Sequence, residues 1–200
     1  MKRLFDLIFT ITLLIAASPL FLLIALLIKS TSRGPVFYKQ ERIGKDGRPI
    51  FCYKFRSMHQ NAASRLKELL ASDPKLQEEW DTFYKLKKDP RITPIGHFLR
   101  KTSLDELPQF FNVLTGDLSV VGPRPVTAHE IKTYYQDKAS LILSIRPGIT
   151  GLWQTSGRNA LSLKERIHLE ERYVKERSFL LDLKLIAKTI PAMLHSKGAY

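Results

Sequence analysis

The sequence predicts an α+β chain that is mostly helical, with an N-terminal membrane helix, a small β-hairpin and a series of short helices. Three observations support this fold class. An apolar run occupies residues 4–28, two β-rich stretches flank a turn containing two glycines, and prolines punctuate the later part of the chain. At 200 residues, the chain is long enough for one domain with a substantial hydrophobic core.

The apolar run at residues 4–28 contains one charged residue, Asp6, and one helix breaker, Pro19. It is long enough to span a bilayer, and no small-residue cleavage site of a signal peptide follows it. A re-entrant helix is the alternative, because Pro19 removes a backbone hydrogen bond near the middle of the run and Ser18 can bond the freed carbonyl. Basic residues flank both ends of the run, so the charges give no orientation. The residues alone leave both topologies open.

A β-hairpin is predicted after a short linker at residues 30–35. Residues 36–40 and 50–55 are rich in β-formers, and the GKDG sequence at 44–47 supplies turn chemistry between them. Residues 59–88 then become helical in composition, with an interruption at Pro74. Beyond them, closely spaced prolines predict short helices joined by defined turns rather than a regular bundle or a wound sheet: Pro90, Pro94, Pro108, Pro123, Pro125 and Pro147.

A final helix is predicted over residues 178–196, where apolar residues form a broad surface with lysines nearby. Two placements are open for this helix. It packs against the core, or it lies in the membrane interface as an amphipathic helix. In either case we expect Pro191 to bend or end the helix.

The charge balance points to anionic partners, because 32 lysines and arginines outnumber 19 aspartates and glutamates to give a formal net charge of +13. The basic residues are not interleaved with aromatic residues as in a nucleic-acid stacking platform, and no nucleic-acid-binding motif is present. We therefore expect no nucleic acid partner. The single cysteine, Cys52, excludes an intramolecular disulfide and a cysteine-cluster metal site.

The adjacent carboxylates of Asp105 and Glu106 are the main candidates for chemistry. The SLDE sequence at 103–106 also matches a capping box, which would explain Ser103 and Glu106 as a helix start without any catalysis. Pro108 favours a later start, near Leu104 or Asp105, because proline is tolerated in a helix only in the first turn. Asp105 would then lie at the positive end of a helix, ionised, at a place that also favours a bound phosphate.

The residues around this pair permit phosphoryl transfer without requiring it. An ionised, positioned aspartate is a competent nucleophile toward a phosphoanhydride. A neighbouring glutamate suits Mg²⁺, which binds through one or two carboxylates together with substrate phosphate oxygens. Three arginines follow in turns fixed by proline or glycine, a geometry suited to binding phosphate oxygens: Arg124, Arg146 and Arg158.

Seven segments together resemble a known family. They are YKFRSM at 53–58, DPRIT at 89–93, SLDELPQ at 103–109, FNVL at 111–114, GDLSVVGPRP at 116–125, RPGITG at 146–151 and SGRN at 156–159. With the KRLFD start at 2–6 and the break at Ser18 and Pro19, they resemble the bacterial sugar transferases, which are monotopic polyprenyl-phosphate phosphoglycosyl transferases. The resemblance covers essentially the whole chain, and its motifs are specific as a set.

The resemblance implies a reaction and assigns roles to the carboxylate pair. Members of the family pass a sugar-1-phosphate from a UDP-sugar to undecaprenyl phosphate and release UMP, as the first membrane step of glycoconjugate assembly. Asp105 corresponds to the nucleophile that forms a covalent phosphosugar intermediate, and Glu106 corresponds to the residue tied to Mg²⁺. The arginine preceding the family's dyad falls on Arg100. The residues expected to bind substrate phosphate are Lys54, Arg56, Arg100, Arg124, Arg146 and Arg158.

The resemblance also implies a topology. It favours a re-entrant helix kinked at Ser18 and Pro19, which divides the chain into an anchor at residues 1–33 and a catalytic domain at 34–200. This domain is expected on the cytoplasmic face of the bacterial inner membrane, in contact with its lipids, with the active site at the membrane interface. The chain resembles the minimal catalytic form of the family. The segments LWQTS at 152–156 and SKGAY at 196–200 resemble the galactose-1-phosphate branch.

Two other classes of function remain as alternatives. A membrane scaffold without chemistry would tolerate Asp105→Asn, whereas an enzyme of the kind described would lose nearly all activity. A conventional glycosyltransferase would release UDP rather than UMP. The sequence leaves open which sugar is transferred, which pathway uses the product and whether the chain forms a homo-oligomer.

Overall fold

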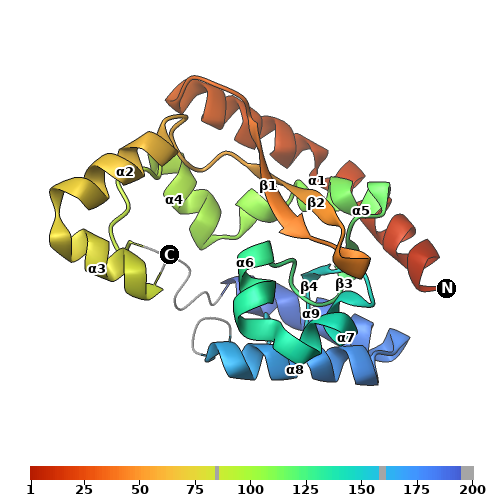
Figure 1. Ribbon diagram of the computed structural model, residues 1–200. Coiled ribbons are helices and arrows are strands. Elements are labelled where there is room, and N and C mark those ends of the chain that lie inside the picture. The colour runs from red at the N-terminus through yellow and green to blue at the C-terminus, as the bar shows by residue number, and fades with distance from the viewer. Residues whose placement is uncertain (84–85, 158–160, 195–200) are drawn as a thin grey trace.

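A computed structural model describes residues 1–83, 86–157 and 161–194 of the chain. Its first element is the 30-residue helix α1 (Lys2–Thr31), which runs along one side of the molecule in Figure 1. Among the described residues, α1 is the one helix whose length and composition would let it cross a membrane. Its apolar side chains are largely exposed, including Leu4, Ile8, Ile11, Ile15, Leu22, Leu23 and Leu26.

Helix α1 continues through Pro19 as one element. Proline has no N–H, so the carbonyl of Ile15 lacks its usual partner in the helix. The hydroxyl of Ser18 donates to that carbonyl over 2.8 Å, which confirms the compensating hydrogen bond expected from the sequence. The predicted kink at these two residues stays a prediction.

Both halves of α1 pack against the rest of the chain. In the N-terminal half, the buried Asp6 accepts hydrogen bonds from the hydroxyl of Ser119 and the backbone N–H of Val120, over 2.8 Å and 3.3 Å. In the C-terminal half, Ile24 and Ile28 are buried in a cluster with residues from two other elements. The helix is therefore held to the same body of protein near each of its ends.

The predicted hairpin is confirmed, with longer strands than expected. Strand β1 (Phe37–Ile43) pairs antiparallel with β2 (Pro49–Phe55) across the short 3₁₀ turn η1 (Lys45–Gly47). Asp46 and Gly47 both have positive φ angles, 57° and 77°, as the favoured two-residue hairpin turns require. Because Tyr38 pairs with Lys54 in this register, Gln40, Arg42, Cys52 and Lys54 share one face of the hairpin.

The helical segment around Pro74 forms two helices, as predicted. They are α2 (Ala62–Ser72) and α3 (Pro74–Phe83), which extend to one end of the molecule in Figure 1. Pro74 occupies the first position of α3, where its missing N–H costs no helical hydrogen bond. Next come α4 (Pro94–Lys101), the 3₁₀ turn η2 (Leu104–Glu106) and α5 (Gln109–Thr115).

The region rich in proline contains one feature that the sequence analysis did not predict. Strand β3 (Ser119–Val121) pairs in parallel with β4 (Gly148–Thr150), forming a second two-stranded sheet. Between these strands lie four short helical elements, which fit the prediction of short helices in this region: α6 (Ala128–Glu130), the π-helix η3 (Ile131–Tyr135), the 3₁₀ turn η4 (Gln136–Lys138) and α7 (Ala139–Leu143).

Two longer helices complete the described chain. Helix α8 (Leu163–Glu176), which the sequence analysis did not single out, starts at a capping box formed by Ser162 and Glu165. Helix α9 (Phe179–Leu194) follows, and Pro191 lies inside it instead of ending it. Leu185 is buried in the core, whereas Phe179, Leu180, Leu183 and Ile190 are exposed. Placement of this helix in the membrane interface stays a prediction.

Three clusters of buried side chains connect these elements. The largest brings residues of β2, α5, β3, α8 and α9 together and includes Cys52, Val113 and Tyr173. The second joins α1 to β2 and α4 through Phe55 and Leu99, and the third joins the short helices to α8. The fold class is confirmed: the chain is mostly helical, with a small antiparallel hairpin and an apolar N-terminal helix suited to a membrane.

Candidate active site

A narrow cleft opens where the hairpin meets η2, α5 and the loop after β3. It contains three basic side chains and one acidic side chain. Its lining residues are Gln40, Arg42, Cys52, Lys54, Glu106, Gln109, Arg124, Pro125, Ile149 and Gln154. Such a lining suits a ligand that carries phosphate groups.

The carboxylate pair lies on η2 beside this cleft. Ser103, the residue before η2, adopts a left-handed backbone with φ 57° and ψ 15°, which is uncommon for a residue other than glycine. Its side chain makes no capping hydrogen bond, so the capping box considered for Ser103 and Glu106 is not formed. The turn begins at Leu104, as Pro108 indicated, but the α-helix starts only at Gln109.

Asp105 is buried, with a relative exposure of 8%. Burial, and to a smaller extent the neighbouring charge of Glu106, raises the pKa of its carboxyl group from 3.8 to about 6. Lys54 and Arg100 oppose the shift. We expected the start of a helix to hold Asp105 ionised. Instead, a single 3₁₀ turn precedes a seven-residue helix, and burial outweighs any favourable dipole.

Glu106 points to the hairpin. The Nζ atom of Lys54 donates to its Oε1 atom over 2.7 Å, and both side chains are partly exposed at the cleft. Lys54 thus contacts one carboxylate directly and also lowers the pKa of the other. This cation on β2 links the hairpin to the turn that carries the carboxylate pair.

Arg100, on α4, interacts electrostatically with Asp105. Its Nε atom donates to the hydroxyl of Ser57 over 2.9 Å, which fixes the guanidinium group. Burial lowers the pKa of Arg100, while the carboxylates of Asp105 and Asp89 raise it. Asp89 is itself paired with Arg91 over 2.6 Å, so the DPRIT segment forms a buried ion pair whose charges act on Arg100.

Arg124 reaches the cleft from the loop after β3. Its backbone N–H donates to the buried carboxylate of Glu170 over 3.2 Å, and its guanidinium lies 5.5 Å from the ring centre of Trp153. Burial raises the pKa of Glu170 to about 7, although hydrogen bonds from Tyr135 and Arg124 act in the opposite direction. Two elements far apart in the sequence therefore hold this arginine at the cleft.

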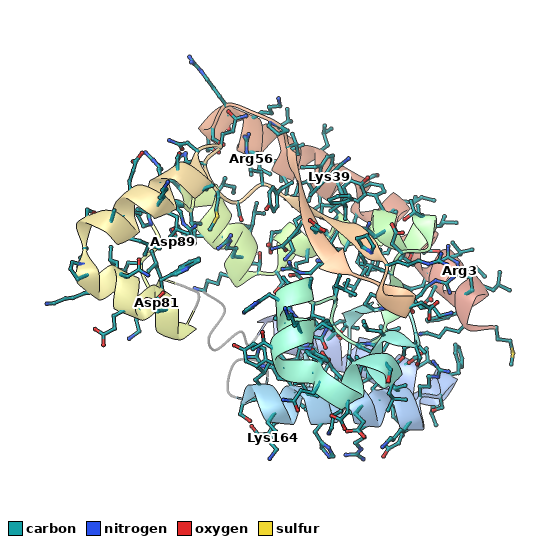
Figure 2. The ribbon with its side chains drawn as sticks, in the orientation of Figure 1. Arg3, Lys39, Arg56, Asp81, Asp89 and Lys164 are labelled. Atoms are coloured by element: carbon teal, nitrogen blue, oxygen red, sulfur yellow. The ribbon has the colours of Figure 1, made fainter. Side chains whose placement is uncertain are left out.

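The other predicted phosphate-binding residues do not meet at the cleft. Arg56 is buried at the C-terminal end of α1, where its guanidinium donates to the carbonyls of Ser32 and Arg33 and to the Ser32 hydroxyl. Figure 2 shows Arg56 at the far end of the hairpin from its turn. Arg146 donates to the carbonyl of Gly116 over 2.7 Å and lines a different cavity. Arg158 lies outside the described residues.

The sequence analysis missed several cleft residues, namely Gln40, Arg42, Gln109 and Gln154. The register of the hairpin contains the signal for the first two. Side chains alternate along a strand, so a face that carries Lys54 also carries the residues opposite Cys52 and Ile50, which are Gln40 and Arg42. Burial lowers the pKa of Arg42, and the charge of Arg124 lowers it further.

The carboxylates at the cleft can be compared with the ligands that the expected Mg²⁺ would need. Among residues 1–83, 86–157 and 161–194, no group of three or more histidine, cysteine, aspartate or glutamate side chains gathers in a way that could hold a metal ion. Mg²⁺ often binds through only one or two carboxylates and takes its remaining ligands from substrate phosphates and water. Glu106, half-buried at the cleft, fits that mode of binding.

Chemically, the site combines a buried carboxylate with nearby cations. A carboxylate with a raised pKa is a stronger base and a stronger nucleophile than an ordinary aspartate, and it is still mostly ionised at neutral pH. Lys54 and Arg100 act on the charge of Asp105, and Arg124 supplies positive charge in the cleft that Glu106 lines.

Comparison with known proteins agrees with this chemistry. The family model described as bacterial sugar transferase matches residues 1–196. The chain belongs to the bacterial sugar transferase family. An undecaprenyl-phosphate galactose phosphotransferase of Salmonella typhimurium is 48% identical to this sugar transferase over 201 residues, covering 100% of the chain and 42% of the relative. The exopolysaccharide production protein ExoY of Sinorhizobium fredii is 48% identical over 199 residues, covering 100% of the chain and 88% of the relative.

The name of a third relative of this sugar transferase gives glucose instead of galactose. The UDP-glucose:undecaprenyl-phosphate glucose-1-phosphate transferase of Klebsiella pneumoniae is 41% identical over 206 residues, covering 100% of the chain. The chain spans 42% of the Salmonella relative and 41% of the Klebsiella relative.

Proposed function

We propose that this sugar transferase moves a sugar-1-phosphate from a UDP-sugar to undecaprenyl phosphate and releases UMP. The observation that carries the proposal is the buried carboxylate of Asp105, whose pKa is raised to about 6 beside a cleft lined with cations. The names of the relatives, which include galactose and glucose phosphotransferases acting on undecaprenyl phosphate, supply the class of substrate.

In the first step, a carboxylate oxygen of Asp105 attacks the β-phosphorus of the UDP-sugar. The bond from this phosphorus to the bridging oxygen breaks, UMP leaves with that oxygen, and the sugar phosphate remains as an aspartyl ester. In the second step, an oxygen of the lipid phosphate attacks the same phosphorus. The acyl-phosphate bond breaks, and the carboxylate of Asp105 is restored. Neither step consumes a proton, so the site requires no separate general base.

The cations around Asp105 act on charge that develops at the phosphates. Arg124 and Arg42 face the cleft, where fixed guanidinium groups stabilise the oxygens of a diphosphate and of a departing UMP. Lys54 and Arg100 keep Asp105 ionised at neutral pH against the effect of burial. Mg²⁺, when bound at Glu106, would supply further positive charge to the diphosphate.

The membrane placement follows from the packing of α1. We propose that α1 enters the cytoplasmic face of the inner membrane and returns to the same face. The first turns of α1 bond to β3 through Asp6, and its last turns pack against β2 and α4 through Ile24 and Ile28. A helix that left the domain to cross a bilayer would carry one of these ends away. The exposed apolar side of α1 supports contact with lipid.

The identity of the released nucleotide tests the reaction. Purified protein in detergent is given undecaprenyl phosphate and a panel of UDP-sugars that includes UDP-galactose and UDP-glucose. We expect UMP, and we expect Asp105→Asn to abolish its release while the fold remains intact. Release of UDP would identify a conventional glycosyltransferase instead. With UDP-sugar alone, a stoichiometric burst of UMP and a sugar phosphate covalently attached to the protein are the expected signs of the intermediate.

Labelling of introduced cysteines tests the topology. Cys52 is buried and is the single cysteine, so Cys52→Ser gives a clean background. In intact spheroplasts, cysteines placed at Lys2 and Arg33 should both resist an impermeant reagent added from outside, and both should react after lysis. A reagent that reaches one of these positions from the outside would establish a spanning helix and reject the re-entrant topology.

A further inference from the structure

A second cavity lies at the N-terminal end of α1, separate from the cleft of Glu106. Its volume is about 260 Å³, and it has no lining residue in common with the cleft. The lining residues come from α1, the hairpin turn, β3, the loop before β4 and the junction of α8 and α9: Lys2, Arg3, Asp6, Lys45, Ser119, Ser144, Ile145, Arg146 and Arg177. Figure 2 shows Arg3 near this end of α1.

The cavity is strongly basic. Five of its lining side chains are lysine or arginine and one, Asp6, is acidic. Both oxygens of Asp6 are engaged, because they accept from the Ser119 hydroxyl and the Val120 N–H over 2.8 Å and 3.3 Å. Lys2 is paired with Asp182 over 2.6 Å, which leaves a surplus of positive charge on the arginines.

Two of the arginines, Arg3 and Arg146, are held in place without being neutralised. Arg3 donates to the carbonyls of Val113 and Leu114 over 2.6 Å and 3.0 Å, and Arg146 donates to the carbonyl of Gly116 over 2.7 Å. Backbone carbonyls orient a guanidinium group but carry no formal charge. Within the described part of the chain, no salt bridge joins Arg3, Arg146 or Arg177 to a carboxylate. Two oriented charges, on Arg3 and Arg146, and the exposed charge of Arg177 therefore remain available to an anion.

The surface next to the cavity is apolar. The exposed side chain of Leu4 lies on α1, and those of Phe179 and Leu180 lie at the start of α9. The rings of Phe5 and Phe179 meet edge to face with their centres 5.1 Å apart, which places these two apolar surfaces side by side. A basic cavity bordered by exposed apolar side chains matches a molecule with an anionic head and a hydrocarbon tail.

We propose that this cavity binds the phosphate of an anionic phospholipid headgroup. The guanidinium groups of Arg3, Arg146 and Arg177 supply the forked donors that phosphate oxygens accept, and the lipid chains lie along α1 and α9. The choice of a lipid, rather than a soluble phosphate, rests on the proposed contact of α1 with the membrane. The site also gives Arg146 a role that does not involve the substrate.

The experiment measures how ligands shift the thermal unfolding midpoint of the full chain in a neutral detergent. The probes are a short-chain phosphatidylglycerol, the phosphatidylcholine of the same chain length and inorganic phosphate. We expect phosphatidylglycerol alone to raise the midpoint. The double variant Arg146→Gln, Arg177→Gln should need at least about tenfold more phosphatidylglycerol for the same shift, since it loses two charged hydrogen-bond donors.

Two further variants serve as controls. Arg65→Gln with Arg172→Gln removes the same two charges from exposed positions on α2 and α8 that do not line the cavity, and it should keep the wild-type response. Arg177→Gln alone changes an exposed side chain, so it gives a folded protein with a weakened response if the double variant is unstable.

Three results would overturn the proposal. The first is a wild-type response in the variants of Arg146 and Arg177, and the second is an equal loss in the control pair. The third is an equal shift with inorganic phosphate or phosphatidylcholine, which would exclude an anionic lipid as the ligand. The measurement is repeated in Asp105→Asn, where the lipid response should persist. Failure of the lipid site is thereby distinguished from failure of the proposed reaction.

Discussion

The Nζ atom of Lys54 lies 2.7 Å from the Oε1 atom of Glu106, so a cation on the hairpin holds the neighbour of the candidate nucleophile. This contact connects β2 to the turn η2, two elements separated by about fifty residues of chain. Lys54 also lowers the pKa of Asp105. Lys54 thereby influences both members of the carboxylate pair, so its removal should affect the position of Glu106 and the pKa of Asp105.

The pH dependence of UMP release should follow the ionisation of Asp105. Its pKa is raised to about 6, so the nucleophilic form is lost as the pH falls through that value. Below it, the rate should decrease about tenfold per pH unit. The first half-reaction, with UDP-sugar and no lipid, is the one to measure, because a phosphate monoester such as the lipid also titrates near pH 6. This decrease is the acid limb of the pH profile. If it began only near pH 4, the conclusion that burial raises the pKa of Asp105 would be contradicted.

Lys54→Met should move this acid limb to higher pH, since the positive charge that favours the ionised form of Asp105 is lost. The rate at neutral pH should also fall, by about tenfold or more, because a charge next to the reacting groups is removed. Lys39→Met is the matched control, because Lys39 is exposed on the opposite face of the same hairpin. Figure 2 labels Lys39 on β1. If the acid limb of Lys54→Met is unshifted, the charge of Lys54 does not influence the ionisation of Asp105.

Arg56→Met should destabilise the protein while leaving the rate per folded molecule within a few-fold of wild type. The side chain donates three hydrogen bonds that hold the C-terminal end of α1, to two carbonyls and a hydroxyl. Their loss should cost about 2 kcal/mol of unfolding free energy, because three partly buried hydrogen bonds to a charged donor are removed. Arg33→Met, which changes an exposed arginine beside the same loop, should have little effect on stability. A large loss of rate in a stably folded Arg56→Met protein would support the assignment of Arg56 to phosphate binding.

Glu170 should make the stability of the fold depend on pH. Its pKa is raised from 4.5 to about 7, so the folded state holds a proton that the unfolded state releases between these values. The protonated Glu170 therefore contributes to the unfolding free energy. This contribution is full below pH 4.5 and is lost as the pH rises through about 7, a change on the order of 3 kcal/mol. Glu170→Gln should remove this part of the pH dependence of the unfolding free energy.

The control for that measurement is Glu176→Gln, which changes an exposed carboxylate on the same helix. It should leave the slope of stability against pH as in the wild type. If Glu170→Gln also keeps the wild-type slope, the carboxyl group is ionised in the fold at all of these pH values. The proposed pKa would then be wrong.

The elements that the sequence predicted correctly depend on local signals. The hairpin turn follows from Asp46 and Gly47, which tolerate positive φ, and the division of the helical region follows from Pro74. Pro108 correctly indicated that no helix is capped at Ser103, although the segment predicted to start a helix near Leu104 or Asp105 is a 3₁₀ turn. In each case the deciding interactions lie within a few residues along the chain, where sequence patterns carry most of their information.

The features that the sequence did not predict depend on contacts between distant segments. Strand β3 meets β4 only because a stretch of short helices returns the chain to it, and no local pattern specifies that pairing. The same holds for the positions of Arg56 and Arg146, whose turns or strands suited phosphate binding but pack elsewhere. The raised pKa of Asp105 is also a tertiary effect, because burial by several elements produces it.

The ion pair between Lys2 and Asp182 joins residues that lie 180 positions apart. A ribosome therefore completes α1 long before it makes the helix that carries Asp182, and the partners of Asp6 on β3 also come much later. During that interval α1 is an apolar helix, and the residues that later pair with its Lys2 and Asp6 have not yet been synthesised. If α1 enters the membrane as proposed, the order of synthesis favours its entry into lipid before the rest of the chain folds against it.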